Sequence, residues 1–432
     1  MLAIFLVCLV ILVALAVPVA SILLLSGIFL ADITGRGRFI NAIGDVYWEN
    51  STGFILISVP LFIFLGEIMV RSGIAGRMYS SVALWLTWLP GGLMHANVAA
   101  STLFAATSGS SVATVATIGT VAYPEIKKRR YHEGIFLGSL AAGGTLGILI
   151  PPSIAMIIYG VMTQTSIPDL YLAGIVPGLI LAVLLSGTIF VICKIKPKWG
   201  GEQTIVSWAE RFRALPDLLA PIAVFGSVVG SIYAGIATPT EAASLGVTVA
   251  LVLSAFYRTL NLQMLLISFE RTMVTTAMVL GIVFASMFLN FVLGFTGISN
   301  AVLAYVTALD LSAVSLVMCL IVFYILLGTF MEELSMILLT LPVVFPIVMD
   351  LNVAGFSDVW FGIIIVLVME LGLISPPFGM NLFVAQALRT RGGPFSDVTR
   401  GAIPFAVPML ILILALVAFP EIATFLPNWV KG

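Results

Sequence analysis

Long apolar runs, each bounded by a few polar residues, constrain the fold of this chain more than any other feature. Of its 432 residues, 61% are hydrophobic and only 9% are charged, whereas soluble domains carry roughly 25% charged residues. Many runs reach the ~20 apolar residues that a membrane-spanning helix needs. The sequence therefore predicts an all-α polytopic protein embedded in a lipid bilayer. A formal net charge of −1 also excludes a nucleic-acid binder.

Motifs for enzymatic chemistry are absent from the sequence. The two histidines, His95 and His132, are far apart, and neither stands in a metal-ligand spacing. The phosphate-binding motif GxxxxGK(S/T) does not occur, so we do not expect ATP hydrolysis by this chain. We predict that the protein is not an enzyme and holds no cofactor. Its energy is then expected to come from an ion gradient or from a partner.

The two halves of the sequence resemble each other. The tripeptide at 72–74 recurs 224 positions later at 296–298. The run at 146–152, which ends in Pro-Pro, recurs 225 positions later at 371–377. Two landmarks with nearly the same offset predict two structural repeats, with the boundary in the polar segment between them.

Each half is expected to contain five membrane crossings and one segment that turns back inside the membrane. Small polar residues stand in the middle of that segment, at 107–111 and 328–329, which suits the tip of a re-entrant hairpin. An odd number of crossings inverts the second repeat relative to the first. The predicted units are a first inverted repeat over 1–200 (hairpin about 92–124, broken helix about 131–165), a cytoplasmic linker over 201–214, and a second inverted repeat over 215–432 (hairpin about 313–346, broken helix about 359–388).

The Pro-Pro pairs within apolar runs predict broken helices. Proline removes a backbone hydrogen bond, and the carbonyl oxygens freed at membrane depth can bind a small hard cation. Each break, together with a hairpin tip, predicts one cation site. The candidate ligands are Ser108, Gly109, Ser110, Ser111, Gly144, Thr145, Gly147 and Pro151 in the first half, and Gly328, Thr329, Glu332, Gly372, Ser375, Pro376 and Gly379 in the second.

Carboxylates within apolar sequence are functional candidates, because a buried one is costly unless it is paired or protonated. They are Glu67, Glu133, Glu241, Glu332, Glu333 and Glu370. Glu332 and Glu333, at the second hairpin tip, are the strongest candidates. Glu133 and Glu241 stand near predicted helix ends, where a capping or solvated role is expected. Glu67 stands close to Arg71 and can reach the membrane surface beside it.

Four segments resemble a known family, the large membrane subunit of tripartite ATP-independent periplasmic (TRAP) transporters. They are Ala105 to Thr114, Gly147 to Ser153, Gly235 to Ala243, and Gly328 to Glu332. The resemblance covers essentially the whole chain. It implies a sodium-driven importer of organic acids in a bacterial inner membrane, with an elevator-type fold. It also implies two partners, a small four-helix membrane subunit and a periplasmic substrate-binding protein.

The same resemblance implies roles for particular segments. The two cation sites become sodium sites, and the stretches at about 74–90 and 298–312 become arms that join a fixed scaffold to a moving transport domain. We expect the substrate contacts to be Ser111, Thr114, Pro152 and Asn381. Two other classes stay open: a proton- or sodium-coupled anion carrier that needs no binding protein, and a membrane enzyme, for which only Glu332 and Glu333 offer acids.

Charge distribution predicts the orientation of the chain. The first basic residue is Arg36, so the apolar start is expected to be kept as membrane structure. If the basic cluster at 127–130 and the linker are cytoplasmic, fifteen Lys and Arg fall inside and three outside, as the positive-inside rule requires. Both termini are then periplasmic, whereas one long helix over 2–30 would move the N-terminus inside.

We expect a C-terminal fusion to report a periplasmic end. Alkaline phosphatase, which is active only outside the cytoplasm, should be active there, and a fluorescent protein that matures only inside should stay dark. The opposite pair of signals would overturn the predicted topology.

Overall fold

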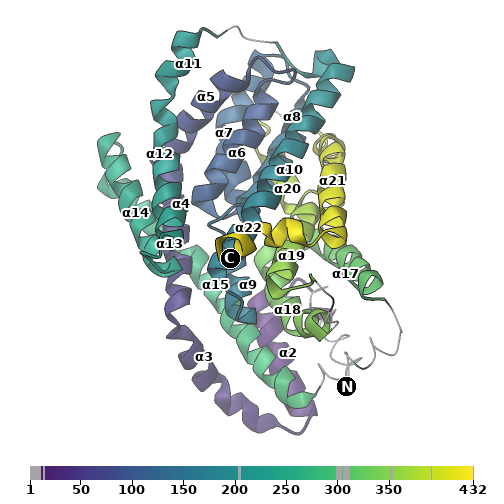
Figure 1. Ribbon diagram of the computed structural model, residues 1–432. Coiled ribbons are helices and arrows are strands. Elements are labelled where there is room, and N and C mark those ends of the chain that lie inside the picture. Colours follow the sequence, from purple (N-terminus) through teal and green to yellow (C-terminus); the bar gives the residue numbers. More distant parts are fainter. Residues whose placement is uncertain are drawn as a thin grey trace.

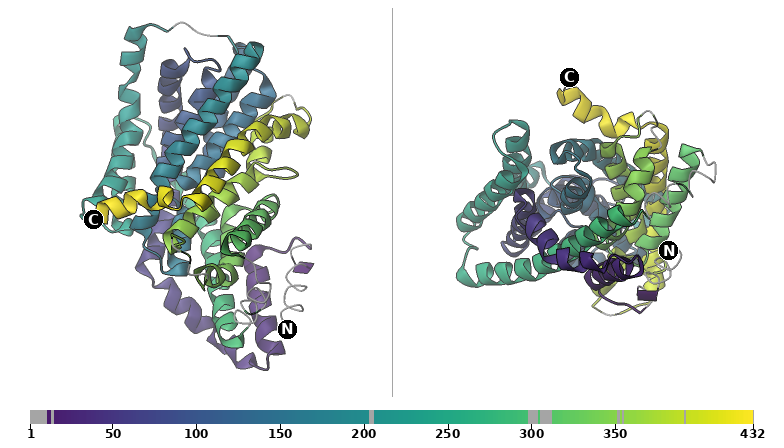
Figure 2. Two further views of the ribbon diagram at one scale, coloured as in Figure 1. Left: turned by 45° about the vertical axis from the view of Figure 1, so that its right-hand side comes forward. Right: turned by 90° about the horizontal axis from the view of Figure 1, so that it is seen from below.

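The computed structural model describes residues 11–12, 15–202, 206–297, 304, 312–350, 353, 355–390 and 392–431. The described chain is built almost entirely of helices, and it contains no β-strand beyond one isolated bridge between Tyr131 and Gly200. Figures 1 and 2 show an elongated bundle in which α22 lies across its side. The all-α prediction is confirmed.

The helices run in chain order as follows. They are α2 (Val19–Ile33), α3 (Ile43–Ser51), α4 (Ser58–Arg71), α5 (Ile74–Leu86), α6 (Leu93–Ser108), α7 (Ser111–Lys128), α8 (Glu133–Leu149), α9 (Ile154–Thr163), α10 (Ile167–Ile195), α11 (Trp208–Ala214), α12 (Pro216–Phe225), α13 (Ser231–Tyr233), α14 (Pro239–Phe256), α15 (Leu262–Thr296), α17 (Ala313–Gly328), α18 (Glu333–Asp350), α19 (Asp358–Leu373), α20 (Met380–Ala387), α21 (Phe395–Ala418) and α22 (Glu421–Lys431).

Many of these helices have the length and apolar character of membrane spans. In the described part of the chain, seven helices or continuous helical stretches qualify, and the pair α8 and α9, bent by 41° at its break, makes up to eight. Two further apolar helices, α2 and α17, are shorter than a full span. These elements confirm a polytopic membrane protein.

Both predicted hairpins correspond to helix pairs. In the first, Gly109 ends α6 with a φ of 60°, in the left-handed region that favours glycine. Ser110 then caps α7, because its side chain accepts a hydrogen bond from the Ala113 amide at 3.5 Å. In the second, the short segment 329–332 joins α17 to α18.

Both predicted helix breaks are present as well. α8 ends at Leu149 and α9 begins at Ile154, while α19 ends at Leu373 and α20 begins at Met380. The Pro-Pro peptide bonds in the two breaks are cis. The inverted relation of the two halves, and the division at 200 and 215, stay predictions. Within the predicted linker, α11 occupies the part from Trp208 onward.

The connection between α4 and the first hairpin is a helix of its own. α5 occupies the first predicted arm, and it packs against both α6 and α12. The second predicted arm, 298–312, lies almost wholly outside the described residues. The alternative of one long helix over 2–30 is wrong, because residues 15–18 are not helical and α2 begins only at Val19. Residues 1–10, where the first of two helices would lie, are not described.

α8 is the centre of the helix packing, with α6, α7, α20 and α21 against it. Its contact with α21 is so close that a Cβ atom added at Gly138 would overlap the Gly401 backbone, and one added at Gly401 would overlap the backbone of Gly134. Small residues allow membrane helices to approach in this way. The sequence of α8 therefore fixes its distance from α21.

We expect Gly138→Ala to destabilise the protein, because one added methyl group would have to push the two backbones apart. Overpacking of this kind costs about 1–3 kcal/mol. Gly187→Ala, in α10, is the matched control, since a Cβ there meets nothing within 4 Å. Thermal unfolding in detergent should show a lower melting temperature for Gly138→Ala alone. Equal melting temperatures for the two variants would contradict the packing argument.

Candidate functional site

The tip of the first hairpin lies directly against the first helix break. A Cβ on Gly109 would stand 3.0 Å from the Pro152 carbonyl oxygen, and one on Gly147 would stand 2.6 Å from the Ser110 carbonyl oxygen. Ser111, the next residue of the hairpin, also packs against α8: a Cβ on Gly144 would stand 3.3 Å from the Ser111 carbonyl oxygen. The structure thus brings together the hairpin tip and the end of α8, as the sequence predicts.

Hydroxyl and carbonyl oxygens are concentrated in this first cluster. The Ser108 and Thr114 hydroxyls are 2.9 Å apart, and the Thr114 hydroxyl donates to the Ser110 carbonyl oxygen at 2.7 Å. Thr145 is fully buried, and its hydroxyl donates to Ala142 in its own helix at 2.7 Å. The side chains of the cluster itself are neutral and rich in oxygen, a donor set that suits a hard monovalent cation.

The second hairpin tip meets the second break in a similar way. A Cβ on Gly328 would stand 3.0 Å from the Gly372 Cα, and the Gly379 amide donates to the Thr329 carbonyl oxygen at 3.1 Å. The Ser375 hydroxyl donates to the Leu371 carbonyl oxygen at 2.6 Å. The candidates around Pro376 in the second half therefore form a second cluster.

Two acidic residues follow the second tip. The Glu332 carboxylate accepts hydrogen bonds from the Ser335 amide at 3.2 Å and from its hydroxyl at 3.0 Å. The Glu333 carboxylate accepts from the Ser111 hydroxyl of the first hairpin at 3.3 and 3.4 Å. This bond connects the tips of the two halves directly, which sequence spacing alone did not predict.

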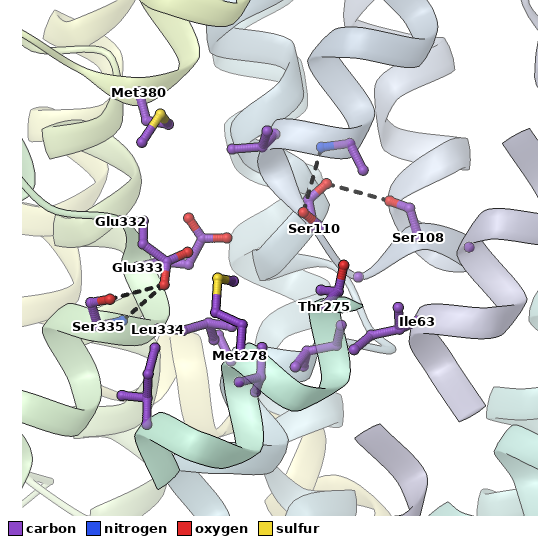
Figure 3. A pocket seen from close by; sticks show the side chains of 18 of the residues that line it. Ile63, Ser108, Ser110, Thr275, Met278, Glu332, Glu333, Leu334, Ser335 and Met380 are labelled. Atoms are coloured by element: carbon purple, nitrogen blue, oxygen red, sulfur yellow. Dashed lines mark hydrogen bonds between the residues drawn. The ribbon is translucent and has the colours of Figure 1, made fainter. Parts of the chain in front are cut away.

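A cavity of about 730 Å³ opens between the two tips and five further helices, α2, α4, α9, α15 and α20. One part of its wall comes from Ser108 and Ser110 of the first hairpin, and another from the Glu332–Ser335 segment of the second. Figure 3 shows the serines and the glutamates on opposite sides of the space. Most of the remaining wall is made by α2, α4 and α15, with Ile63, Gly66, Thr275 and Met278 among its residues, and the rest comes from the first turns of α9 and α20.

The predicted substrate contacts do not line this cavity. All four are buried and absent from its lining: Ser111, Thr114, Pro152 and Asn381. The Asn381 amide nitrogen donates to the Ala141 carbonyl oxygen at 3.2 Å, and its own oxygen has no partner among the described residues. The lining residues of α2, α4 and α15 were missed, because most of them are ordinary apolar helix residues with no signal in the sequence.

The other glutamates take separate roles. Glu241 forms a capping box with Thr238, which confirms its predicted capping role. Glu67 pairs with Arg71 at 3.0 Å. Glu133 pairs with Arg389 at 2.9 Å and so ties α8 to the end of α20. The hydrogen bonds to Glu133 raise the pKa of Arg389 above its usual value.

The fold agrees with a solved transporter, YdaH from Alcanivorax borkumensis, described as having an unusual topology. The TM-score is 0.62 at 15% identity, over 89% of this chain and 88% of that one.

Residues 6–422 match the family model described as the DctM component of tripartite ATP-independent periplasmic transporters. Among its relatives are the C4-dicarboxylate TRAP transporter large permease protein DctM of Pseudomonas aeruginosa, 35% identical over 88% of both chains, and the ectoine/5-hydroxyectoine large permease protein UehC of Ruegeria pomeroyi, 35% identical over 86% of this chain and 85% of the relative. The chain belongs to this family. It is a multi-pass permease subunit of a bacterial inner membrane, and it is not an enzyme.

Proposed function

We propose that this chain imports a small organic acid by sodium symport, with an elevator movement of its two hairpins and broken helices. A periplasmic substrate-binding protein would deliver the acid, and a small four-helix membrane subunit would complete the complex. The observation that carries the proposal is the cavity, which is lined by the two hairpin tips and the first turns of α9 and α20 on one side and by the helices α2, α4 and α15 on the other. An organic acid fits the relatives, which are named for a C4-dicarboxylate and for ectoine.

Sodium as the coupling ion is supported by the oxygen-rich clusters at both tips. A break leaves carbonyl oxygens without helical partners, and Na⁺ is bound well by such neutral oxygens. In the first cluster the Ser108 and Ser110 oxygens lie at the cavity edge. A cation held there would offer a positive charge to a substrate carboxylate. Ion and substrate would thus assist each other's binding.

The membrane potential would add to the driving force. Each elementary charge that crosses 100 mV contributes about 2.3 kcal/mol. Two sodium ions with a monoanion move one net charge, which corresponds to roughly a fortyfold bias, since 1.4 kcal/mol is tenfold. A dianion would move none, and the sodium concentration gradient would then act alone.

An elevator movement is supported by how the helices are joined. The moving body would contain the two hairpins, α6–α7 and α17–α18, together with α8 and α19 to α21. The Gly138–Gly401 and Gly328–Gly372 contacts and the Glu133–Arg389 ion pair would hold it together. α2 and α4 pack against α15, and α4 also packs against α14 and, across the boundary between the two groups, against α6. The cavity lies where these two groups meet, so movement of one past the other would expose it to alternate sides.

We expect Thr145→Val and Ser110→Val to weaken sodium dependence, because each removes a hydroxyl from the first cluster. The sodium concentration for half-maximal uptake should rise tenfold or more in proteoliposomes that contain the membrane subunits and are supplied with the binding protein. Thr120→Val is the matched control, because this exposed α7 residue also donates to its own helix, at 2.7 Å. Wild-type uptake that proceeds equally without sodium, or follows a proton gradient alone, would overturn the coupling and make Glu332 the leading proton carrier.

We expect a crosslink between the two helix groups to stop transport. The Ser286 hydroxyl of α15 donates to the Leu338 carbonyl oxygen of α18 at 2.6 Å, so Ser286→Cys and Leu338→Cys can be joined by a short thiol crosslinker, after the native cysteines are replaced by serine. The control pair, Thr240→Cys and Phe54→Cys, lies at a similar hydroxyl-to-carbonyl bond of 3.1 Å within one group.

Only the first crosslink should abolish uptake, and a reducible linker should restore it on reduction. Full activity in a verified Ser286–Leu338 crosslinked sample would contradict the elevator movement.

A further inference from the structure

The charged residues that line the cavity are all acidic. They are Glu67, Glu332 and Glu333, and the described residues of the wall include no lysine, arginine or histidine. A site built for a simple anion usually supplies cationic or amide donors around it. The side chains of this cavity that could donate to a small anion are neutral hydroxyls, those of Ser108, Ser110, Thr275 and Ser335.

The three carboxylates differ in the hydrogen bonds and ion pairs that offset their negative charge. Glu67 is paired with Arg71. Glu332 accepts two hydrogen bonds from Ser335 and belongs to the proposed second sodium cluster. Glu333 accepts from the Ser111 hydroxyl, at 3.3 and 3.4 Å, and no ion pair within the described chain involves it. Among the described residues, no basic side chain therefore offsets the negative charge of Glu333 at the cavity wall.

A further carboxyl lies buried in the same half of the protein. Glu370 of α19 is fully buried, and both of its oxygens lack a partner among the described residues. Carboxylates in a low-dielectric interior disfavour a second negative charge nearby. A ligand that places its negative end beside Glu333 would be rejected, and one that places a cation there would be retained.

We propose that the transported acid is a zwitterion, whose cationic nitrogen binds against Glu333 while its carboxylate binds at Ser108 and Ser110. This inference rests on the proposed function and names its substrate class: amino acids, betaines or cyclic amidine acids. The two ends of such a molecule match the opposite walls seen in Figure 3. The carboxylate also meets the N-terminal end of α7, where backbone amides favour an anion. Ile63, Met278 and Leu334 supply apolar wall for the carbon skeleton.

The test compares pairs of ligands of equal shape that differ only in the cation. Glycine betaine is paired with 3,3-dimethylbutyrate, in which carbon replaces the quaternary nitrogen, and proline is paired with cyclopentanecarboxylate. Binding to the complete membrane complex in nanodiscs is measured by thermal shift and by calorimetry in sodium buffer. For at least one pair, the zwitterion should bind at least tenfold more tightly than its anionic counterpart. Anions that bind as well as or better than the zwitterion in every pair would overturn the proposal.

Glu333→Gln tests the assigned residue. The zwitterion preference should fall at least tenfold in this variant, while Glu421→Gln should keep it. Glu421 is a matched control, because it also begins a helix, α22, and is exposed away from the cavity. A zwitterion preference that survives in Glu333→Gln would overturn the assignment of Glu333 as the residue that binds the cationic nitrogen. The comparison of ligand pairs on the wild-type protein does not depend on the folding of any variant.

The same measurements separate this inference from the proposed function. Sodium-dependent binding of the anions alone would overturn the zwitterion and leave sodium-coupled acid import standing. Zwitterion binding that is unchanged in sodium-free buffer would overturn sodium coupling and leave the substrate class standing.

Discussion

Backbone groups that lose their helical partners inside a bilayer have to find others within the protein, because lipid offers none. The breaks at Pro151–Pro152 and Pro376–Pro377 each release such groups, and a hairpin tip covers each break. The Gly379 amide donates to the Thr329 carbonyl oxygen, and Gly109 stands beside the Pro152 carbonyl oxygen. Tip and break therefore depend on each other: the tip shields the unwound backbone, and the unwound backbone supplies the oxygens around which a cation site can form.

Side-chain size, more than polarity, sets the geometry of these contacts. Gly147 faces the Ser110 carbonyl oxygen, and Gly328 faces Gly372, at distances that leave no room for a Cβ atom. The same limit brings α8 close to α21 at Gly138. Because these contacts are backbone against backbone, a hairpin cannot move away from its break without exposing polar groups. This favours movement of tip and break together as one body, with sliding confined to the face toward α2, α4 and α15.

The sequence predicted the parts of this structure that have a chemical signature of their own. Pro-Pro pairs marked the breaks, and Gly-Ser tips marked the hairpins, because each is costly in lipid without a special partner. The cavity wall from α2, α4 and α15 had no such signature: Ile63 and Met278 are apolar residues that would suit any membrane helix. The bond from Ser111 to Glu333 was also beyond prediction, because it joins residues 222 positions apart and depends on how the halves meet.

The position of the acidic residues has a consequence for the transport cycle under the proposed coupling. Glu332 and Glu333 stand on the side of the cavity that would move in the proposed elevator, and no basic side chain of the described wall accompanies them. An empty carrier would have to carry their charge through the low-dielectric region beside α15, which is unfavourable by several kcal/mol for each unpaired ion. Bound sodium, and the cationic end of a substrate, would cancel that charge. Movement would then be favourable only when ions and substrate are bound together, which is the condition for symport without leakage of sodium.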